Sequence, residues 1–187
     1  MNLPNKLTIS RIFLTAAFVF FVLAKGLPAK ILAFVIFSLA SSTDVLDGYL
    51  AKRNNEITDF GKLMDPIADK ILVLAAFLAF VEIGIIPSWM VVVIISREAA
   101  ITGLRILALT KGKVIPADDG GKHKTISQVV AIFVILLFLI FKEGGANITA
   151  YENLIYLVML LTTALTLISG AAYLIKNKEV YFNAKEN

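Results

Sequence analysis

The sequence predicts an all-α integral membrane protein with six transmembrane helices and both termini in the cytoplasm. Of its 187 residues, 58% are hydrophobic and the mean hydropathy is +0.83, whereas soluble domains contain roughly 45–50% apolar residues. The apolar residues also occur in long blocks, such as the thirteen consecutive residues from Val129 to Phe141. Lysine and arginine are concentrated in alternate connecting segments, which is typical of a chain that crosses a bilayer repeatedly.

Six apolar segments approach, with their flanks, the roughly 20 residues that cross a bilayer. Each should be an α-helix, because hydrocarbon offers backbone N–H and C=O groups no other partner. The first segment follows Lys6 and Arg11, as in a signal peptide, but no convincing cleavage site follows it and five further apolar segments do. We therefore interpret it as a retained span. The expected spans are Ile9–Ala24, Ala29–Ala51, Phe60–Val81, Pro87–Leu109, Thr125–Phe141 and Leu154–Ile175.

The positive charges indicate the orientation. The N-terminal end, the second and fourth connections and the C-terminal tail contain twelve lysines and arginines, whereas the opposite connections contain only Lys25, Lys30 and Lys142. Cytoplasmic segments are the ones enriched in these residues, so both termini are expected in the cytoplasm of a multi-pass protein of the inner or plasma membrane. Residues 1–187 are expected to form one membrane-embedded domain, with a polar, frayed tail after Lys176.

Four aspartates border the second and third apolar segments. Asp44 and Asp47 are three residues apart, and Asp65 and Asp69 are four apart, so each pair lies on one face of a helix. Carboxylates beside hydrocarbon are costly and mark functional sites, and four together repel unless cations neutralise them. Oxygen ligands with no histidine or cysteine nearby favour Mg²⁺ or Mn²⁺, and four carboxylates can hold two such ions for phosphoryl transfer.

Small residues accompany these acids. Gly48, Ala51 and Gly61 leave bare backbone that a flat or phosphorylated ligand can approach closely, and Lys52 and Arg53 add positive charge for its phosphates. The alternative is that the aspartates form a solvated loop or pair with nearby lysines. That alternative does not explain why acids lie toward apolar runs, so we favour the metal site.

The segment from Asp44 to Asp69 resembles the signature of the CDP-alcohol phosphotransferases. Its fixed positions match in identity and spacing, and one further position differs. Lys52 stands where the family usually has arginine, which keeps the charge but loses the bidentate geometry. The matching residues are Asp44, Asp47, Gly48, Ala51, Gly61, Asp65 and Asp69.

The resemblance implies a six-helix membrane enzyme, often a homodimer, that transfers a phosphatidyl group from a CDP-linked lipid to an alcohol and releases CMP. It implies that the four aspartates hold two Mg²⁺ or Mn²⁺ ions and that Asp69 also deprotonates the acceptor hydroxyl. The residues expected at the CDP group are Gly48, Ala51, Lys52 and Gly61.

The fourth apolar segment carries two arginines. Arg97 and Arg105 are eight residues apart and therefore lie on nearly one helix face. Charges within an apolar helix face the interior and need a partner, which Glu98 could supply. One glutamate cannot neutralise all the cations here, because Lys122 and Lys124 enter the next segment. We therefore favour a pocket for the phosphate of an acceptor over simple pairing with Glu98.

Three further segments resemble bacterial phosphatidylglycerophosphate synthases within that family. They are Asn2–Thr8 with Arg11, Ser96–Arg105 and Gly121–Gln128. The implied acceptor is sn-glycerol 3-phosphate, bound through Arg97, Arg105 and Lys122, and the implied donor is CDP-diacylglycerol. The product is phosphatidylglycerophosphate, made on the cytoplasmic side. Membrane lipid and a second copy of the chain are further implied partners, and no nucleic acid is expected.

The residues also leave alternatives open. Another acceptor, such as inositol phosphate or serine, would use the same aspartates. A small ion-coupled transporter could place acids and arginines within its spans, although the chain has no evident inverted repeat and its acids lie at one membrane face. A non-catalytic scaffold is a more distant possibility, because it gives the aspartates no purpose.

Overall fold

The structure is a computed structural model that describes residues 3–54, 59–112, 115, 119–146 and 149–182. Within these ranges, the side chains of residues 3–8, 43–54, 59–69, 119–123, 149–150 and 181–182 lie outside the description. The described residues form helices and no strand. The helices are α1 (Leu3–Leu23), α2 (Leu27–Asn54), α3 (Asp59–Glu82), α4 (Ser88–Thr110), α5 (Asp119–Glu143), α6 (Thr149–Lys176) and α7 (Glu179–Phe182).

Helices α1 to α6 confirm the helical character of all six expected spans. The observed helices are mostly longer than the apolar runs, as at α1, which begins at Leu3 instead of Ile9, and at α5, which begins at Asp119 instead of Thr125. Polar residues at these ends continue the backbone hydrogen-bond pattern although they do not belong to the apolar run. Helix α4 starts one residue later than expected, because Pro87 has extended backbone angles and precedes the helix.

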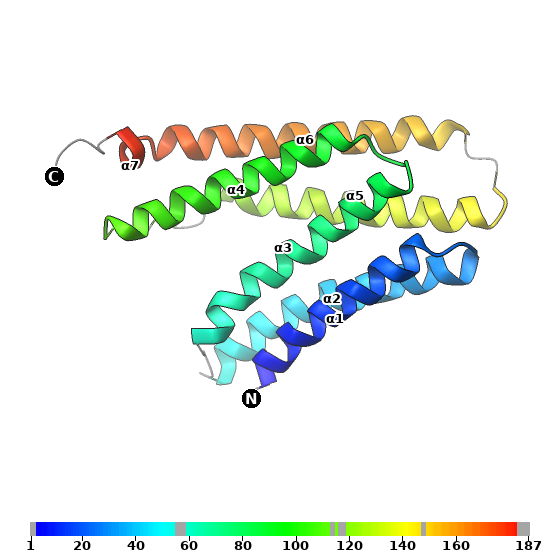
Figure 1. Cartoon of the computed structure of the whole chain (residues 1–187), viewed down its shortest axis with the longest axis horizontal. Coiled ribbons are helices and arrows are strands. Elements are labelled where there is room, and N and C mark those ends of the chain that lie inside the picture. Colours follow the sequence, from blue (N-terminus) through cyan, green and yellow to red (C-terminus); the bar gives the residue numbers. More distant parts are fainter. Residues whose placement is uncertain (1–2, 55–58, 113–114, 116–118, 147–148, 183–187) are drawn as a thin grey trace. The chain divides into compact units, whose positions relative to one another are not determined.

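The first of two compact units comprises Met1–Ile85 and Ile132–Glu152, and so contains α1, α2, α3 and the second half of α5. Helix α1 packs against both α2 and α3, and it runs alongside α2 in Figure 1. The ring centres of Phe18 and Phe37 are 5.4 Å apart, and those of Phe37 and Phe133 are 5.2 Å apart. These aromatic contacts connect α1, α2 and α5 within the unit.

Polar contacts hold the turn between α1 and α2. Gly26 has a φ of +97°, a conformation that favours glycine, and its N–H donates to Glu143 Oε2 over 3.1 Å. Lys30 Nζ donates to the carbonyl oxygens of Val22 at 2.6 Å and Ala24 at 2.7 Å. These are carbonyls that the end of α1 leaves without helical partners. Lys30 is therefore a buried side chain that caps α1, although the sequence analysis counted it among the cations of the connecting segments.

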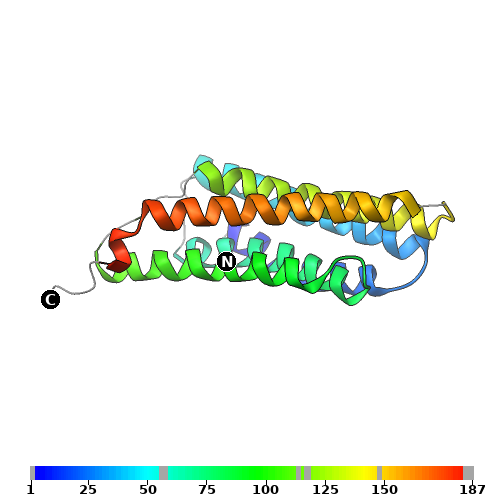
Figure 2. The same cartoon turned by 90° about the horizontal axis from the view of Figure 1, so that it is seen from above.

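The second unit comprises Ile86–Ala131 and Asn153–Asn187, and so contains α4, the first half of α5, most of α6 and α7. Helix α7 packs against α4, and Figure 2 shows it folded back toward the C-terminal end of that helix. Val180 of α7 is buried, and Lys111 Nζ donates to its carbonyl oxygen over 2.6 Å. The buried cluster here comprises Ile101, Leu104, Ala108, Tyr173 and Val180.

The prediction of a frayed tail after Lys176 is therefore wrong for Glu179–Phe182, which form helix α7. The tail reads as polar along the sequence, but its one valine is covered by apolar side chains of α4 and α6. This burial depends on residues about 70 positions away in the chain, which local composition does not reveal. Burial of the apolar side chain stabilises the short helix on α4.

Among the described residues, two helices are long and apolar enough to cross a bilayer. The apolar parts of these two helices are Lys124–Glu143 of α5 and Tyr151–Lys176 of α6. Shorter apolar stretches cover Ile9–Leu23 of α1 and Leu27–Ser42 of α2. One side of α6 exposes large apolar side chains, as a helix in contact with lipid does. These residues are Leu157, Leu161, Leu165 and Ile168. The six-span arrangement and the location of both termini stay predictions.

Candidate active site

The four aspartates lie on two helices of the first unit. Asp44 and Asp47 belong to α2, and Asp65 and Asp69 belong to α3. Each pair lies within one continuous helix, and a shared helix face for its two members stays a prediction from their spacing. Both helices pack against α1. The side chains of the four aspartates lie outside the described residues, and the facing of one pair toward the other stays a prediction.

The segment between these helices is short. Only residues 55–58 separate α2 from α3, so the small residues near the acids belong to helix ends instead of a long connecting loop. The residues expected at the CDP group lie accordingly, with Gly48, Ala51 and Lys52 on α2 and Gly61 on α3.

The donor set of these helix ends fits a hard divalent cation. Four carboxylates at helical spacing supply oxygen ligands only, the chemistry that Mg²⁺ and Mn²⁺ prefer. Among the side chains that the structure describes, no group of three or more histidine, aspartate or glutamate residues gathers, and the chain has no cysteine. The oxygen chemistry of the four aspartates makes them the candidate metal ligands.

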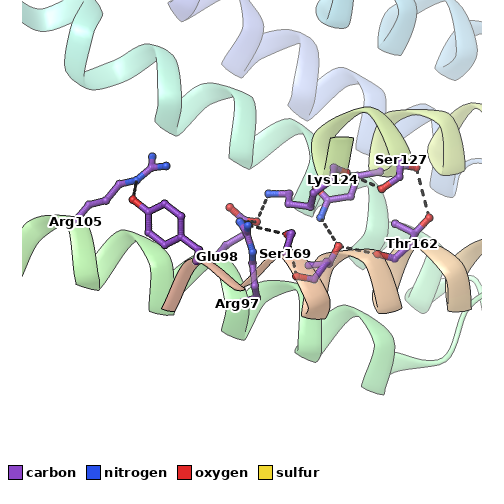
Figure 3. A network of polar contacts seen from close by, with 10 residues as sticks. Arg97, Glu98, Arg105, Lys124, Ser127, Thr162 and Ser169 are labelled. Atoms are coloured by element: carbon purple, nitrogen blue, oxygen red, sulfur yellow. Dashed lines mark hydrogen bonds and ion pairs between the residues drawn. The ribbon is translucent and has the colours of Figure 1, made fainter. Parts of the chain in front are cut away.

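A second polar centre lies in the second unit, where α4, α5 and α6 each contribute side chains (Figure 3). Arg97 of α4 donates through Nη1 to Glu98 Oε1 at 3.1 Å and through Nη2 to the hydroxyl of Ser169 on α6 at 3.0 Å. Lys124 of α5 donates to the same oxygen of Glu98. The side chains of Arg97 and Glu98 are only 10% and 12% exposed, so solvent and salt screen these charges weakly.

Arg105 lies two turns further along α4 and has a different partner. Its Nε donates to the hydroxyl of Tyr173 on α6 at 3.2 Å, and its guanidinium carbon lies 5.4 Å from the centre of the tyrosine ring. Tyr173 is 3% exposed. Both Arg97 and Arg105 therefore contact α6, as we expect of charges within an apolar helix.

Glu98 pairs with Arg97, as the alternative interpretation of this segment required, and it pairs with Lys124 as well. Two cations from different helices thus contact one carboxylate oxygen. The side chain of Lys122 lies outside the described residues, so its part in the phosphate pocket stays a prediction. Of the two lysines that enter α5, Lys124 is the one whose contact with Glu98 is described.

Sequence reasoning missed the residues of α6 that hold the arginines. Ser169 and Tyr173 accept hydrogen bonds from Arg97 and Arg105. Gly170 lies against the stem of Arg97, because a Cβ atom at this glycine would be 2.7 Å from Arg97 Cγ. The available signal was a stripe of polar residues at intervals of three and four in an apolar helix. The stripe comprises Thr162, Thr166, Ser169 and Tyr173.

The same stripe meets polar groups of α5. Gln128 Nε2 donates to the hydroxyl of Thr166 at 3.4 Å, and the hydroxyl of Thr162 donates to the carbonyl oxygen of Ser127 at 3.5 Å. Figure 3 shows these contacts continuing the network from Lys124 along α5 and α6. In an apolar helix such polar contacts hold neighbouring helices together.

Comparison with known proteins decides the family. Residues 1–176 match the CDP-alcohol phosphatidyltransferase family, which is nearly the whole chain. The chain belongs to this family. The resemblance carried by Asp44 to Asp69 is thereby confirmed. Because the CDP-alcohol phosphatidyltransferases are enzymes, the transporter and scaffold interpretations are set aside.

Curated relatives extend the similarity. The chain is 44% identical over 148 residues to the CDP-diacylglycerol–glycerol-3-phosphate 3-phosphatidyltransferase of Bacillus subtilis, with 73% of this chain and 77% of the relative covered. It is 37% identical over 175 residues to a probable phosphatidylglycerophosphate synthase of Mycobacterium tuberculosis, covering 92% and 79%. A protein of Rickettsia bellii with the same name as the Bacillus subtilis relative is 35% identical to the chain over 173 residues. The match covers 92% of this chain and 93% of that relative.

Family membership also bears on the metal and the membrane. CDP-alcohol phosphatidyltransferases generally use divalent metal ions, which agrees with the oxygen-only donor set of the four aspartates. The family and the two long apolar helices together indicate a membrane protein.

Proposed function

We propose that the chain transfers the phosphatidyl group of CDP-diacylglycerol to sn-glycerol 3-phosphate. The products are phosphatidylglycerophosphate and CMP, a step of phospholipid biosynthesis. The observation that carries this proposal is the similarity over most of the chain to relatives with that named activity, at 35–44% identity. The aspartates of α2 and α3 and the cations of α4 and α5 supply the two kinds of side chain that the reaction requires.

The aspartates have the following proposed roles. Asp44, Asp47 and Asp65 hold two Mg²⁺ or Mn²⁺ ions together with Asp69. When bound, such ions polarise the pyrophosphate of the CDP-lipid and stabilise the departing CMP. Asp69 in addition accepts the proton of the acceptor hydroxyl. The hydroxyl oxygen then forms a bond to the phosphatidyl phosphorus as the bond between that phosphorus and CMP breaks. Helical spacing within each pair supports this assignment.

The CDP group is proposed to lie against the helix ends that carry the small residues. Gly48, Ala51 and Gly61 lack bulky side chains, so the backbone there can approach a nucleotide closely. Lys52 supplies one positive charge for its phosphates, although an ammonium group lacks the paired donors of arginine.

The acceptor phosphate is proposed to bind the cations of the second unit. Arg97 and Arg105 are the candidate ligands on α4, and Lys122 is the candidate on α5. The support is the gathering of cations around Glu98, since Arg97 of α4 and Lys124 of α5 both contact its carboxylate. Guanidinium groups suit this role because they donate two parallel hydrogen bonds to phosphate oxygens.

The proposed setting is a multi-pass protein of the inner or plasma membrane. It has six spans, with both termini and the active site on the cytoplasmic side, and the lysine and arginine distribution supports this orientation. One membrane-embedded domain over residues 1–187 and a homodimer complete the proposal.

A direct assay of CMP release tests this function. Purified full-length protein in detergent with Mg²⁺ and CDP-diacylglycerol should release CMP when sn-glycerol 3-phosphate is added. Glycerol, serine and inositol phosphate, supplied in parallel at the same concentration, should give much less. Absence of CMP with every divalent metal and acceptor would refute the reaction. Faster turnover with an unphosphorylated acceptor would refute the phosphate pocket and leave the phosphatidyl transfer intact.

A further inference from the structure

Glu98 connects two cations that come from different helices. Its Oε1 atom accepts from Arg97 Nη1 at 3.1 Å and also from Lys124 Nζ. Arg97 belongs to α4 and Lys124 to α5, so the two cations are not close in the sequence and are brought together only by the packing of the helices. The three side chains are between 8% and 12% exposed, which leaves little water to weaken the charge interactions.

Arg97 is held from its other side by α6. Its Nη2 donates to the Ser169 hydroxyl at 3.0 Å, and its aliphatic stem lies on Gly170. The guanidinium therefore has one anchor on α4 and one on α6. Lys124 has Glu98 as its described charge partner. Removal of the carboxylate would take away the oxygen atom that both cations contact, and the repulsion between their like charges would then favour their separation.

We propose that Glu98 is a positioning residue, which keeps Arg97 and Lys124 close enough to bind the phosphate of the acceptor together. The proposal rests on the proposed function, because it concerns the site of that acceptor. It adds Lys124 to the phosphate site and gives Glu98 a role there. Arg97 and Lys124 are both cationic, and cations gathered in one place attract a phosphate group.

The positioning role predicts the opposite sign from simple neutralisation. If Glu98 only neutralised the cations, its removal would free them and strengthen the binding of an anion. If it positions them, its removal weakens binding, because the two cations separate. The neutral variant Glu98→Gln therefore distinguishes the two roles by the direction of the change.

The experiment measures steady-state kinetics on full-length protein in detergent for the wild type, Glu98→Gln, Glu98→Asp and Glu82→Gln. Glu82 is an exposed glutamate at the end of α3 and serves as the matched control. We expect Glu98→Gln to raise the KM for sn-glycerol 3-phosphate about tenfold or more, since about 1.4 kcal/mol corresponds to tenfold. The KM for CDP-diacylglycerol should change less than about twofold, a small free-energy difference on the same scale. Glu98→Asp should recover part of the loss, and Glu82→Gln should behave as the wild type.

A double variant tests whether the effect of Glu98 depends on Lys124, which a general loss of folding would not. In a Lys124→Met background Glu98 keeps Arg97 but has no Lys124 to hold beside it, so Glu98→Gln should raise the KM for glycerol phosphate much less than it does alone. An equal increase in both backgrounds would overturn the positioning role. A lower or unchanged KM in the single variant would do the same, as would parallel increases in both substrate KM values.

Calorimetric binding of sn-glycerol 3-phosphate to the same proteins, without CDP-lipid, separates this inference from the proposed function. Binding by the wild type that weakens about tenfold in Glu98→Gln, with no CMP release by either, would refute the transfer reaction and support the positioning role. Normal CMP release with unchanged acceptor affinity in Glu98→Gln would refute the positioning role alone. Absence of both binding and turnover in the wild type would overturn both.

Discussion

Arg97 crosses α6 directly over Gly170, so closely that a Cβ atom on residue 170 would lie 2.7 Å from Arg97 Cγ and 3.2 Å from its Nε. Cγ is near the root of the side chain and cannot swing away as a guanidinium tip can. The absence of a side chain on α6 is therefore what allows Arg97 to reach Ser169 and Glu98. The position of the Arg97 side chain, which is proposed to bind the acceptor phosphate, therefore depends on a glycine in another helix.

Gly170→Ala should displace Arg97 and weaken acceptor binding. The added methyl group overlaps the arginine stem, and we expect the KM for sn-glycerol 3-phosphate to rise about tenfold, which corresponds to about 1.4 kcal/mol. Overpacking of this kind also destabilises a fold by about 1–3 kcal/mol. Gly103→Ala is the control, because nothing lies within 4 Å of a Cβ atom there. Equal kinetics for both variants would contradict the steric argument.

Tyr173→Phe should separate the packing of this residue from its hydrogen bond. The ring stays in the buried cluster, while Arg105 loses the hydroxyl that accepts from its Nε. We expect a stability loss of only about 1 kcal/mol and a higher KM for glycerol phosphate. Tyr173→Ala should lose about 3–5 kcal/mol, because it removes a buried aromatic ring. Thermal unfolding and acceptor kinetics measure the two effects, and identical unfolding of both variants would contradict the burial.

Chelation of divalent metal should stop the reaction reversibly. EDTA removes the cations that the four aspartates are proposed to hold, and added Mg²⁺ or Mn²⁺ should restore CMP release.

Asp69→Asn should lower kcat by about 10²–10⁴-fold, the usual contribution of a general base, and no amount of Mg²⁺ should restore it. Glu152→Gln, at an exposed carboxylate of α6, is the control. Full activity of Asp69→Asn would exclude it as the base.

Lys30→Met should destabilise the protein without changing its kinetics. The methionine retains an apolar stem but removes the ammonium that donates to Val22 and Ala24, and a buried acceptor left unsatisfied costs about 1–3 kcal/mol. Lys25→Met, at an exposed lysine of the same turn, should unfold as the wild type does. Equal thermal midpoints for the two variants would show that the cap contributes nothing.

Single cysteines can test the predicted topology, because the chain contains no cysteine of its own. Lys25 and Lys178 are both exposed, and they lie on opposite sides of the membrane if there are six spans. An impermeant maleimide added to intact cells should label Lys25→Cys, whereas Lys178→Cys should react only after permeabilisation. Labelling of both variants in intact cells would refute the predicted orientation.

Much of the secondary structure was predictable because helix formation in an apolar run is local. The run from Val129 to Phe141 has no backbone partner other than itself in hydrocarbon, and it lies within α5. Glu179–Phe182 was not predictable in this way. Its helix depends on the burial of Val180 against residues of α4 and α6, and no pattern within the tail encodes that contact.

The six long helices, the four-aspartate signature and the family could be inferred from the amino-acid sequence, because each depends on local backbone pairing or on the spacing of residues along one chain segment. Three contacts became evident only from the packed helices: Glu98 pairs with Lys124, Tyr173 accepts from Arg105, and Gly170 makes room for Arg97. The physical reason is that these contacts join different helices. They depend on how each helix is rotated about its axis and on how closely its neighbour approaches, and both are set by packing of all the side chains between them.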